Sequence, residues 1–179
     1  MKTQKSRFQL LTAPNRARVL DTLDAFTRAY LITALWSSVD SSGEPLDRAY
    51  SLEDYSASAL ASAIHDCARF QRENETTIAA AIASGDVTCG PDFCERGRAG
   101  HDFWLTRNRH GAGFWDGDWP EAQAGKLTQA AHAFGEVNAE AGSDGAIHFD
   151  RENEFWQRAA GLHWSQTGAN RREYRGSCV

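Results

Sequence analysis

The sequence predicts an α+β fold, in which an antiparallel β-sheet of three or four strands packs with N-terminal helices and one inserted helix. Two observations predict it. Apolar residues repeat at helical spacing over residues 15–84, and two pairs of β-prone segments follow within residues 101–150. A helical segment separates the two pairs, so the expected order is hairpin, helix, hairpin. At 179 residues the chain fits one domain, assigned to residues 1–150, with a C-terminal extension of residues 151–179.

The first predicted helix covers residues 15–36. Its apolar side chains recur every three or four residues, at Val19, Leu23, Phe26, Tyr30 and Ala34. The polar run of residues 37–45, which contains Gly43 and Pro45, is expected to end it.

A second helical region is predicted to begin near Ser51, which with Asp54 forms a variant of the capping box. Its apolar stripe continues through Leu60, Ile64, Cys67 and Ala68. Residues 76–84 are rich in alanine and predicted helical, and Gly85-Asp86 is expected to stop them. Residues 87–100 are expected to be a loop, because Gly90-Pro91 and Gly97 interrupt any regular pattern.

The first hairpin is predicted from residues 102–107, a β-prone run that ends at the turn signal of residues 108–111, with residues 112–116 as the return strand. Residues 125–134 read as a short amphipathic helix. The second hairpin is predicted from residues 136–140 and 146–149, which flank the turn signal Gly142-Ser143-Asp144-Gly145.

Composition sets the expected compartment and surface charge. No apolar run is long enough for a secretory signal or a membrane span, so we expect a cytosolic protein. Residues 19–150 hold nine basic and twenty-one acidic side chains, a net charge of −12, whereas the two ends of the chain are basic. Short basic ends are more often solvated termini than nucleic-acid contacts, so a nucleic-acid partner is not expected.

The cysteines leave three interpretations open. Free thiols are expected at Cys67, Cys89, Cys94 and Cys178. A zinc site would need Cys89 and Cys94 with His101 or His110, although a single Cys-x4-Cys spacing is a weak signal. A disulfide between Cys89 and Cys94 would require an oxidising medium.

Residues 100–116 read GHDFWLTRNRHGAGFWD and resemble an uncharacterised family of bacteriophage and prophage proteins, whose pattern is similar to GHDFWLTRNGHGAGFWD. Residues 34–38, 127–136 and 144–145 are similar to the same family. Arg109 departs from the pattern, because members usually have Gly there. The resemblance implies a phage or mobile-element accessory protein that acts inside the host bacterium. It transfers no catalytic residues, because the family has none agreed.

The predicted hairpin gathers two groups of candidate residues. Its strand ends bring His101 and Asp102 near Asp116, a set that suits a divalent metal or acid–base chemistry but also ordinary turns. Its tip gathers residues 107–110, where arginine and histidine beside glycine suit an anion. The candidate contacts with a ligand or partner are Trp104, Arg107, Arg109, His110 and Trp115.

Two classes of function follow. The first is a non-enzymatic protein in the host cytoplasm that binds a bacterial host protein, such as a defence protein, and interferes with it. The second is a small enzyme or sequestering protein for a nucleotide-like anionic ligand, held by Arg107 and His110. No recognised catalytic or phosphate-binding motif appears in the sequence, which favours the first class. No cofactor and no membrane partner are expected.

Overall fold

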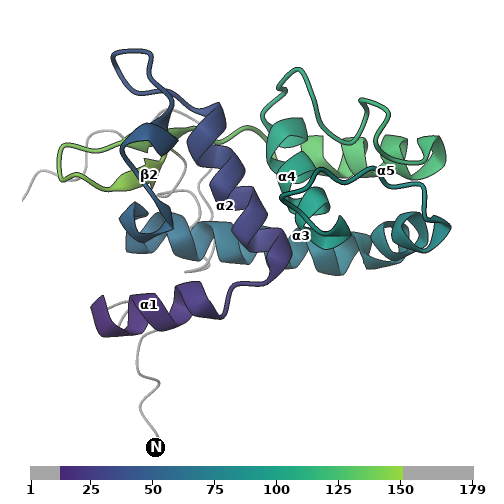
Figure 1. The fold of residues 1–179 in the computed structure, drawn as a ribbon, viewed down its shortest axis with the longest axis horizontal. Helices are drawn as coiled ribbons and strands as arrows, with labels where there is room; N and C mark the ends of the chain where they lie inside the picture. The colour runs from purple at the N-terminus through teal and green to yellow at the C-terminus, as the bar shows by residue number, and fades with distance from the viewer. Residues whose placement is uncertain (1–12, 151–179) are drawn as a thin grey trace, which may run out of the picture.

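The computed structural model describes residues 13–150, and it is mostly helical (Figure 1). Its helices are α1 (Ala13–Asp21), α2 (Ala25–Ser37), α3 (Ala57–Ser84), α4 (Glu95–Arg107) and α5 (Glu121–His132). Two short 3-10 helices, η2 (Leu46–Arg48) and η3 (Leu52–Asp54), connect α2 to α3. The strands β1 (Ala139–Ala141) and β2 (Ile147–Phe149) form one two-stranded antiparallel sheet. The predicted sheet of three or four strands is therefore wrong for the described residues.

The long helix α3 organises the arrangement, since α2, α5 and the β-hairpin all pack against it (Figure 1). Helices α2 and α4 make the most extensive contact between elements. The hairpin joins the start of α3, where the Ser56 amide donates to the Ile147 carbonyl at 2.8 Å. The predicted extension of residues 151–179 lies outside the described residues. No helix within residues 13–150 is long and apolar enough to cross a membrane.

The predicted helix of residues 15–36 is in fact two helices, α1 and α2. The break falls at Thr22–Asp24, where Asp24 caps the second helix by accepting from the Thr27 amide at 2.6 Å. The Arg28 guanidinium donates to the Leu20 carbonyl at 2.6 Å and so ties α2 back to the end of α1. The apolar spacing continues across the break, which is why the periodicity alone did not reveal it.

Local capping signals around α3 are confirmed. Ser51 and Asp54 form a capping box, although on the short helix η3, and Ser56 caps α3 itself. Gly85 ends α3 in the left-handed conformation, with φ 76°, as the sequence predicts. Between these caps the structure has a single helix of 28 residues.

The aromatic run of residues 102–107 is helical, and the predicted strand there is wrong. All six of its residues are buried, so the run has neither helical nor strand periodicity. Gly100 lies so close to α2 that a methyl group added to it would overlap the Phe26 carbonyl. The predicted loop of residues 87–100 accordingly ends early, because α4 begins at Glu95.

The residues after α4 form a loop, so the predicted return strand of residues 112–116 is also wrong. Helix α4 ends in a Schellman motif, in which the His110 amide donates to the Leu105 carbonyl at 2.9 Å. Within that motif Arg109 takes the left-handed conformation, with φ 56°. The inserted helix is confirmed as α5, shifted to residues 121–132.

The second predicted hairpin is confirmed, with its first strand shifted from residues 136–140 to residues 139–141. Strands β1 and β2 pair antiparallel with Ala139 opposite Phe149 and Ala141 opposite Ile147. The predicted turn closes through the Gly142 amide, which donates to the Ala146 carbonyl at 2.8 Å. Ile147 and Phe149 on β2 face the interior and are buried.

A cluster of aromatic rings forms the centre of the core. Phe70 of α3 and Phe103 of α4 stack with centroids 4.0 Å apart, and Phe114 of the loop adds a ring 5.9 Å from Phe70. Phe26, Tyr30 and Phe134 complete the contacts around Phe103. This packing fixes α4 and the following loop in place, and both carry the candidate site.

Candidate functional site

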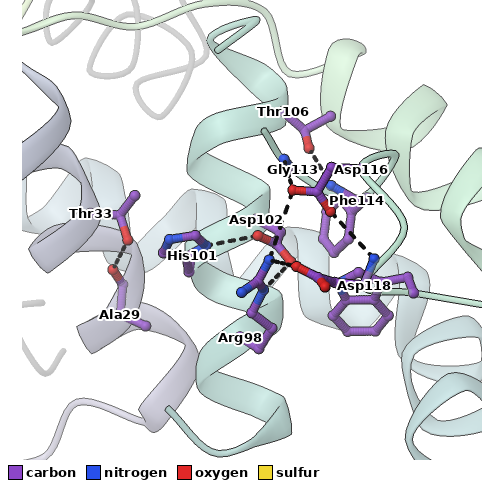
Figure 2. A network of polar contacts seen from close by, with 11 residues as sticks. Ala29, Thr33, Arg98, His101, Asp102, Thr106, Gly113, Phe114, Asp116 and Asp118 are labelled. Atoms are coloured by element: carbon purple, nitrogen blue, oxygen red, sulfur yellow. Dashed lines mark hydrogen bonds and ion pairs between the residues drawn. The ribbon is translucent and has the colours of Figure 1, made fainter. Parts of the chain in front are cut away.

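A fully buried carboxylate on α4, that of Asp102, is the centre of a polar network (Figure 2). Asp102 Oδ2 accepts from Arg98 Nε and from Trp119 Nε1, both at 2.7 Å. Its Oδ1 lies 2.7 Å from His101 Nδ1. A buried carboxylate is an acceptor only, so Nδ1 carries the proton and donates. Three donors satisfy the buried charge, as burial of an ionised group requires.

Arg98 extends the network to the loop after α4. Its Nη2 donates to Asp118 Oδ2 and lies 3.9 Å from Asp116 Oδ2. Burial opposes the charge on Arg98, but the hydrogen bond to Asp102 and the three nearby carboxylates raise the pKa of the guanidinium above its usual range. The guanidinium therefore stays charged and clamps the loop to α4.

Two further contacts hold the loop of residues 108–120, which we call the Trp115 loop. The Thr106 hydroxyl oxygen of α4 accepts from the Phe114 amide at 3.0 Å, and Asp116 Oδ2 accepts from the Gly113 amide at 3.2 Å. A side chain at Gly113 would overlap the Thr106 hydroxyl, so the close approach requires glycine. Trp115 lies between these fixed residues and is 54% exposed.

The outer side of His101 meets aromatic rings. In Figure 2 the imidazole points from Asp102 toward α2. It stacks on Trp36 of α2, with centroids 5.9 Å apart, and contacts Phe93 at 5.4 Å. Trp36 is 42% exposed. We call Trp36, Phe93, Arg98, His101 and Asp102 the His101 site.

The polar chemistry of the His101 site is set by the histidine tautomer. Because Nδ1 donates to Asp102, the lone pair of the neutral ring lies on Nε2. Nε2 has no hydrogen-bond partner among residues 13–150. It can therefore accept a hydrogen bond from a group that reaches the exposed part of the ring, since the His101 side chain is 13% exposed.

The structure separates the predicted contact residues into buried and exposed ones. Trp104 is buried, and its indole N–H donates to the Ser37 hydroxyl at 2.8 Å. Arg107 is buried as well and donates to Tyr30 Oη at 2.8 Å, to Asp66 Oδ2 at 3.0 Å and to the Gly135 carbonyl at 2.9 Å. These two side chains stabilise the core and face no solvent.

The remaining predicted contacts are on the surface. Arg109 is exposed and forms an ion pair with Glu136 at 3.0 Å. His110 is half-buried, and burial lowers the pKa of its imidazole below the usual 6.5. Trp115 is exposed. The predicted anion-binding tip does not form as expected, because Arg107 points into the core.

The predicted metal set is brought together only in part. His101 and Asp102 are bonded directly, but Asp116 reaches them through Arg98. Within residues 13–150 no group of three or more His, Cys, Asp or Glu side chains is arranged to hold a metal ion. Cys67, Cys89 and Cys94 are free thiols, and burial raises the pKa of Cys67 well above its usual range. Cys178 lies outside the described residues.

Sequence reasoning did not include Trp36, Phe93, Arg98 or Trp119 in the site. Only the Arg98–Asp102 pair had a local signal, since residues four apart share one face of a helix. Trp36 and Trp119 come from other segments of the chain. No model of a protein family, no curated protein and no solved structure matches this chain. The similarity of residues 100–116 to phage proteins therefore stays a prediction from the sequence.

Proposed function

We propose that this protein binds a bacterial host protein and interferes with it, as an accessory protein of a phage or other mobile element. The observation that carries the proposal is Trp115, a large aromatic side chain exposed on a loop that is fixed on both sides. The resemblance of residues 100–116 supports the phage setting. A host defence protein is one candidate partner in that setting.

An exposed tryptophan on a fixed backbone is suited to protein binding. Tryptophan is enriched among the residues that dominate binding energy at interfaces. Association is also less costly when the contact residue is ordered beforehand. Phe114 anchors the loop in the core on one side of Trp115, and Asp116 holds it on the other. Trp115 thus needs little reordering when a partner binds.

The alternative of a nucleotide-like anionic ligand has less support. Arg107, the cation assigned to it, uses its donors on Tyr30, Asp66 and two backbone carbonyls. Residues 19–150 also carry a net charge of −12, which repels anions. These observations favour a protein partner.

The test compares wild type with Trp115→Ala and with Val39→Ala as bait in host lysate. Val39 is a matched control because it is another exposed apolar side chain, at 57%. We expect one host protein to be retained by wild type and Val39→Ala. With that protein purified, calorimetry should show at least about a tenfold weaker Kd for Trp115→Ala. Equal affinity for all three baits, or no retained protein, would contradict the proposal.

A further inference from the structure

The solvent-facing side of α2 is apolar in the second half of the helix, whereas in the first half the half-buried Arg28 lies one turn before Ile32. Most of the helix is buried, and its exposed large side chains are Ile32 and Trp36, one turn apart. Trp36 also stacks on His101, so the exposed ring is held in place from behind. An ordered, exposed aromatic ring beside a polar group is a typical recognition surface.

The stacking leaves room on the indole for a second planar group. The two ring planes are inclined by 27° and their centroids are 5.9 Å apart, so the imidazole covers only part of the Trp36 ring. A flat group lying beside the imidazole on the indole would approach the exposed part of His101, whose side chain is 13% exposed. There Nε2 offers an acceptor, because Asp102 fixes the proton on Nδ1.

The charge at the site selects the kind of group that can bind. Arg98 is the one cation of the network, and it faces three carboxylates, those of Asp102, Asp116 and Asp118. The network therefore carries surplus negative charge. The surrounding residues 19–150 are acidic overall. This field attracts cations and repels a second copy of the same acidic surface.

We propose that the His101 site binds an arginine side chain of the partner protein, with the guanidinium stacked on Trp36 and donating to His101 Nε2. Arginine fits better than lysine because its guanidinium is planar, stacks on aromatic rings and donates within its plane. The inference rests on the proposed function and adds the chemistry that the partner presents: a basic surface with an exposed arginine.

The test uses three synthetic twelve-residue peptides that alternate glycine with arginine, lysine or citrulline. Citrulline keeps the planar shape of arginine but has a carbonyl oxygen in place of one terminal nitrogen, so it has no charge and fewer donors. Binding is followed at low salt and pH 8 by fluorescence from a label on the peptide. We expect the arginine peptide to bind best and the citrulline peptide to bind least. Trp36→Ala should weaken the binding of the arginine peptide by about tenfold without changing the net charge of the protein.

Two histidine variants distinguish a hydrogen bond to His101 Nε2 from non-specific electrostatic attraction. His101→Asn keeps an amide donor where Nδ1 faces Asp102 but removes Nε2, so the arginine peptide should bind about tenfold more weakly. His132→Asn, on α5, is the matched control and should bind like wild type. Circular dichroism confirms that each variant is folded.

Two results would overturn the inference. One is equal binding of the arginine peptide by wild type, Trp36→Ala and His101→Asn, which would mean that the acidic surface attracts it without a specific site. The other is equal binding of the arginine and citrulline peptides. In either case a host protein retained through Trp115 would leave the proposed function intact. Conversely, specific arginine binding without any retained host protein would support the site alone.

Discussion

Arg109 is the one non-glycine residue with a positive φ among residues 13–150. Its φ of 56° places it in the left-handed region, which costs a residue with a Cβ atom about 1–2 kcal/mol. The position follows the last turn of α4, where glycine is the favoured residue.

We predict that Arg109→Gly stabilises the protein by about 1 kcal/mol, because it relieves the left-handed strain. The variant loses the exposed ion pair with Glu136, but such pairs contribute little. Arg109→Ala is the control, since it loses the ion pair and keeps the strain. Urea unfolding should therefore rank Arg109→Gly above wild type and above Arg109→Ala. If the two variants were equally stable, the strain would not be the cause.

His110, next to Arg109, gives a prediction about pH. Burial lowers the pKa of its imidazole below the 6.5 of the unfolded chain. As the pH falls through that value, the unfolded chain takes up a proton that the native protein resists, so stability decreases. His110→Gln cannot titrate, and its free energy of unfolding should fall less between about pH 7.5 and pH 5. An NMR titration midpoint at or above 6.5 for His110 would contradict this prediction.

At the scale of elements, the contact between α2 and α4 depends on a glycine. A methyl group at Gly100 would overlap the Phe26 carbonyl, and backbone cannot move as easily as a flexible side chain. We expect Gly100→Ala to destabilise the protein by about 2 kcal/mol or more, because the two central helices must separate. Gly125→Ala is the matched control: Gly125 lies in α5 with open space around it. That variant should gain up to about 1 kcal/mol from helix propensity. The test is the Tm of the two variants in thermal unfolding. Similar changes in Tm at the two positions would argue against close packing at Gly100.

The elements that the sequence predicts well are those that depend on residues close in sequence. The cap of η3 at Ser51 and Asp54, the stop of α3 at Gly85 and the turn between β1 and β2 depend on neighbouring residues. Each is therefore visible in the sequence. Helix α4 is not, because its aromatic run favours a strand locally. It becomes helical because Gly100 meets α2 and Arg107 reaches Tyr30, Asp66 and the residues after α5, which are long-range contacts.

At the scale of the whole molecule, the site also combines residues that are close in sequence with residues that only long-range contacts bring together. His101 and Asp102 are neighbours in sequence, so the sequence predicts them together, although at the end of a strand. The residues that complete their environment come from α2 and from the Trp115 loop, through Trp36 and Trp119. The packing of α2 against α4 brings Trp36 to the site, and the hydrogen bond from Trp119 to Asp102 joins the Trp115 loop to it. Trp104 and Arg107 are inside because every side of this part of α4 is covered, so no periodicity in the sequence distinguishes an inner from an outer face.

The net charge of −5 is spread unevenly over the molecule, and this leads to the last prediction. Residues 19–150 hold twenty-one acidic and nine basic side chains, so repulsion opposes the compact state. Raising NaCl from about 20 to about 300 mM screens that repulsion and should raise Tm by roughly 2 to 4 °C. Ion pairs such as Arg96–Glu75 oppose the trend, but exposed pairs contribute little.

The double variant Asp47→Asn with Glu53→Gln removes two exposed acidic charges. Its Tm should be higher at low salt and respond less to NaCl, because less repulsion is left to screen. A Tm that falls as salt is added would mean that the ion pairs outweigh the net charge.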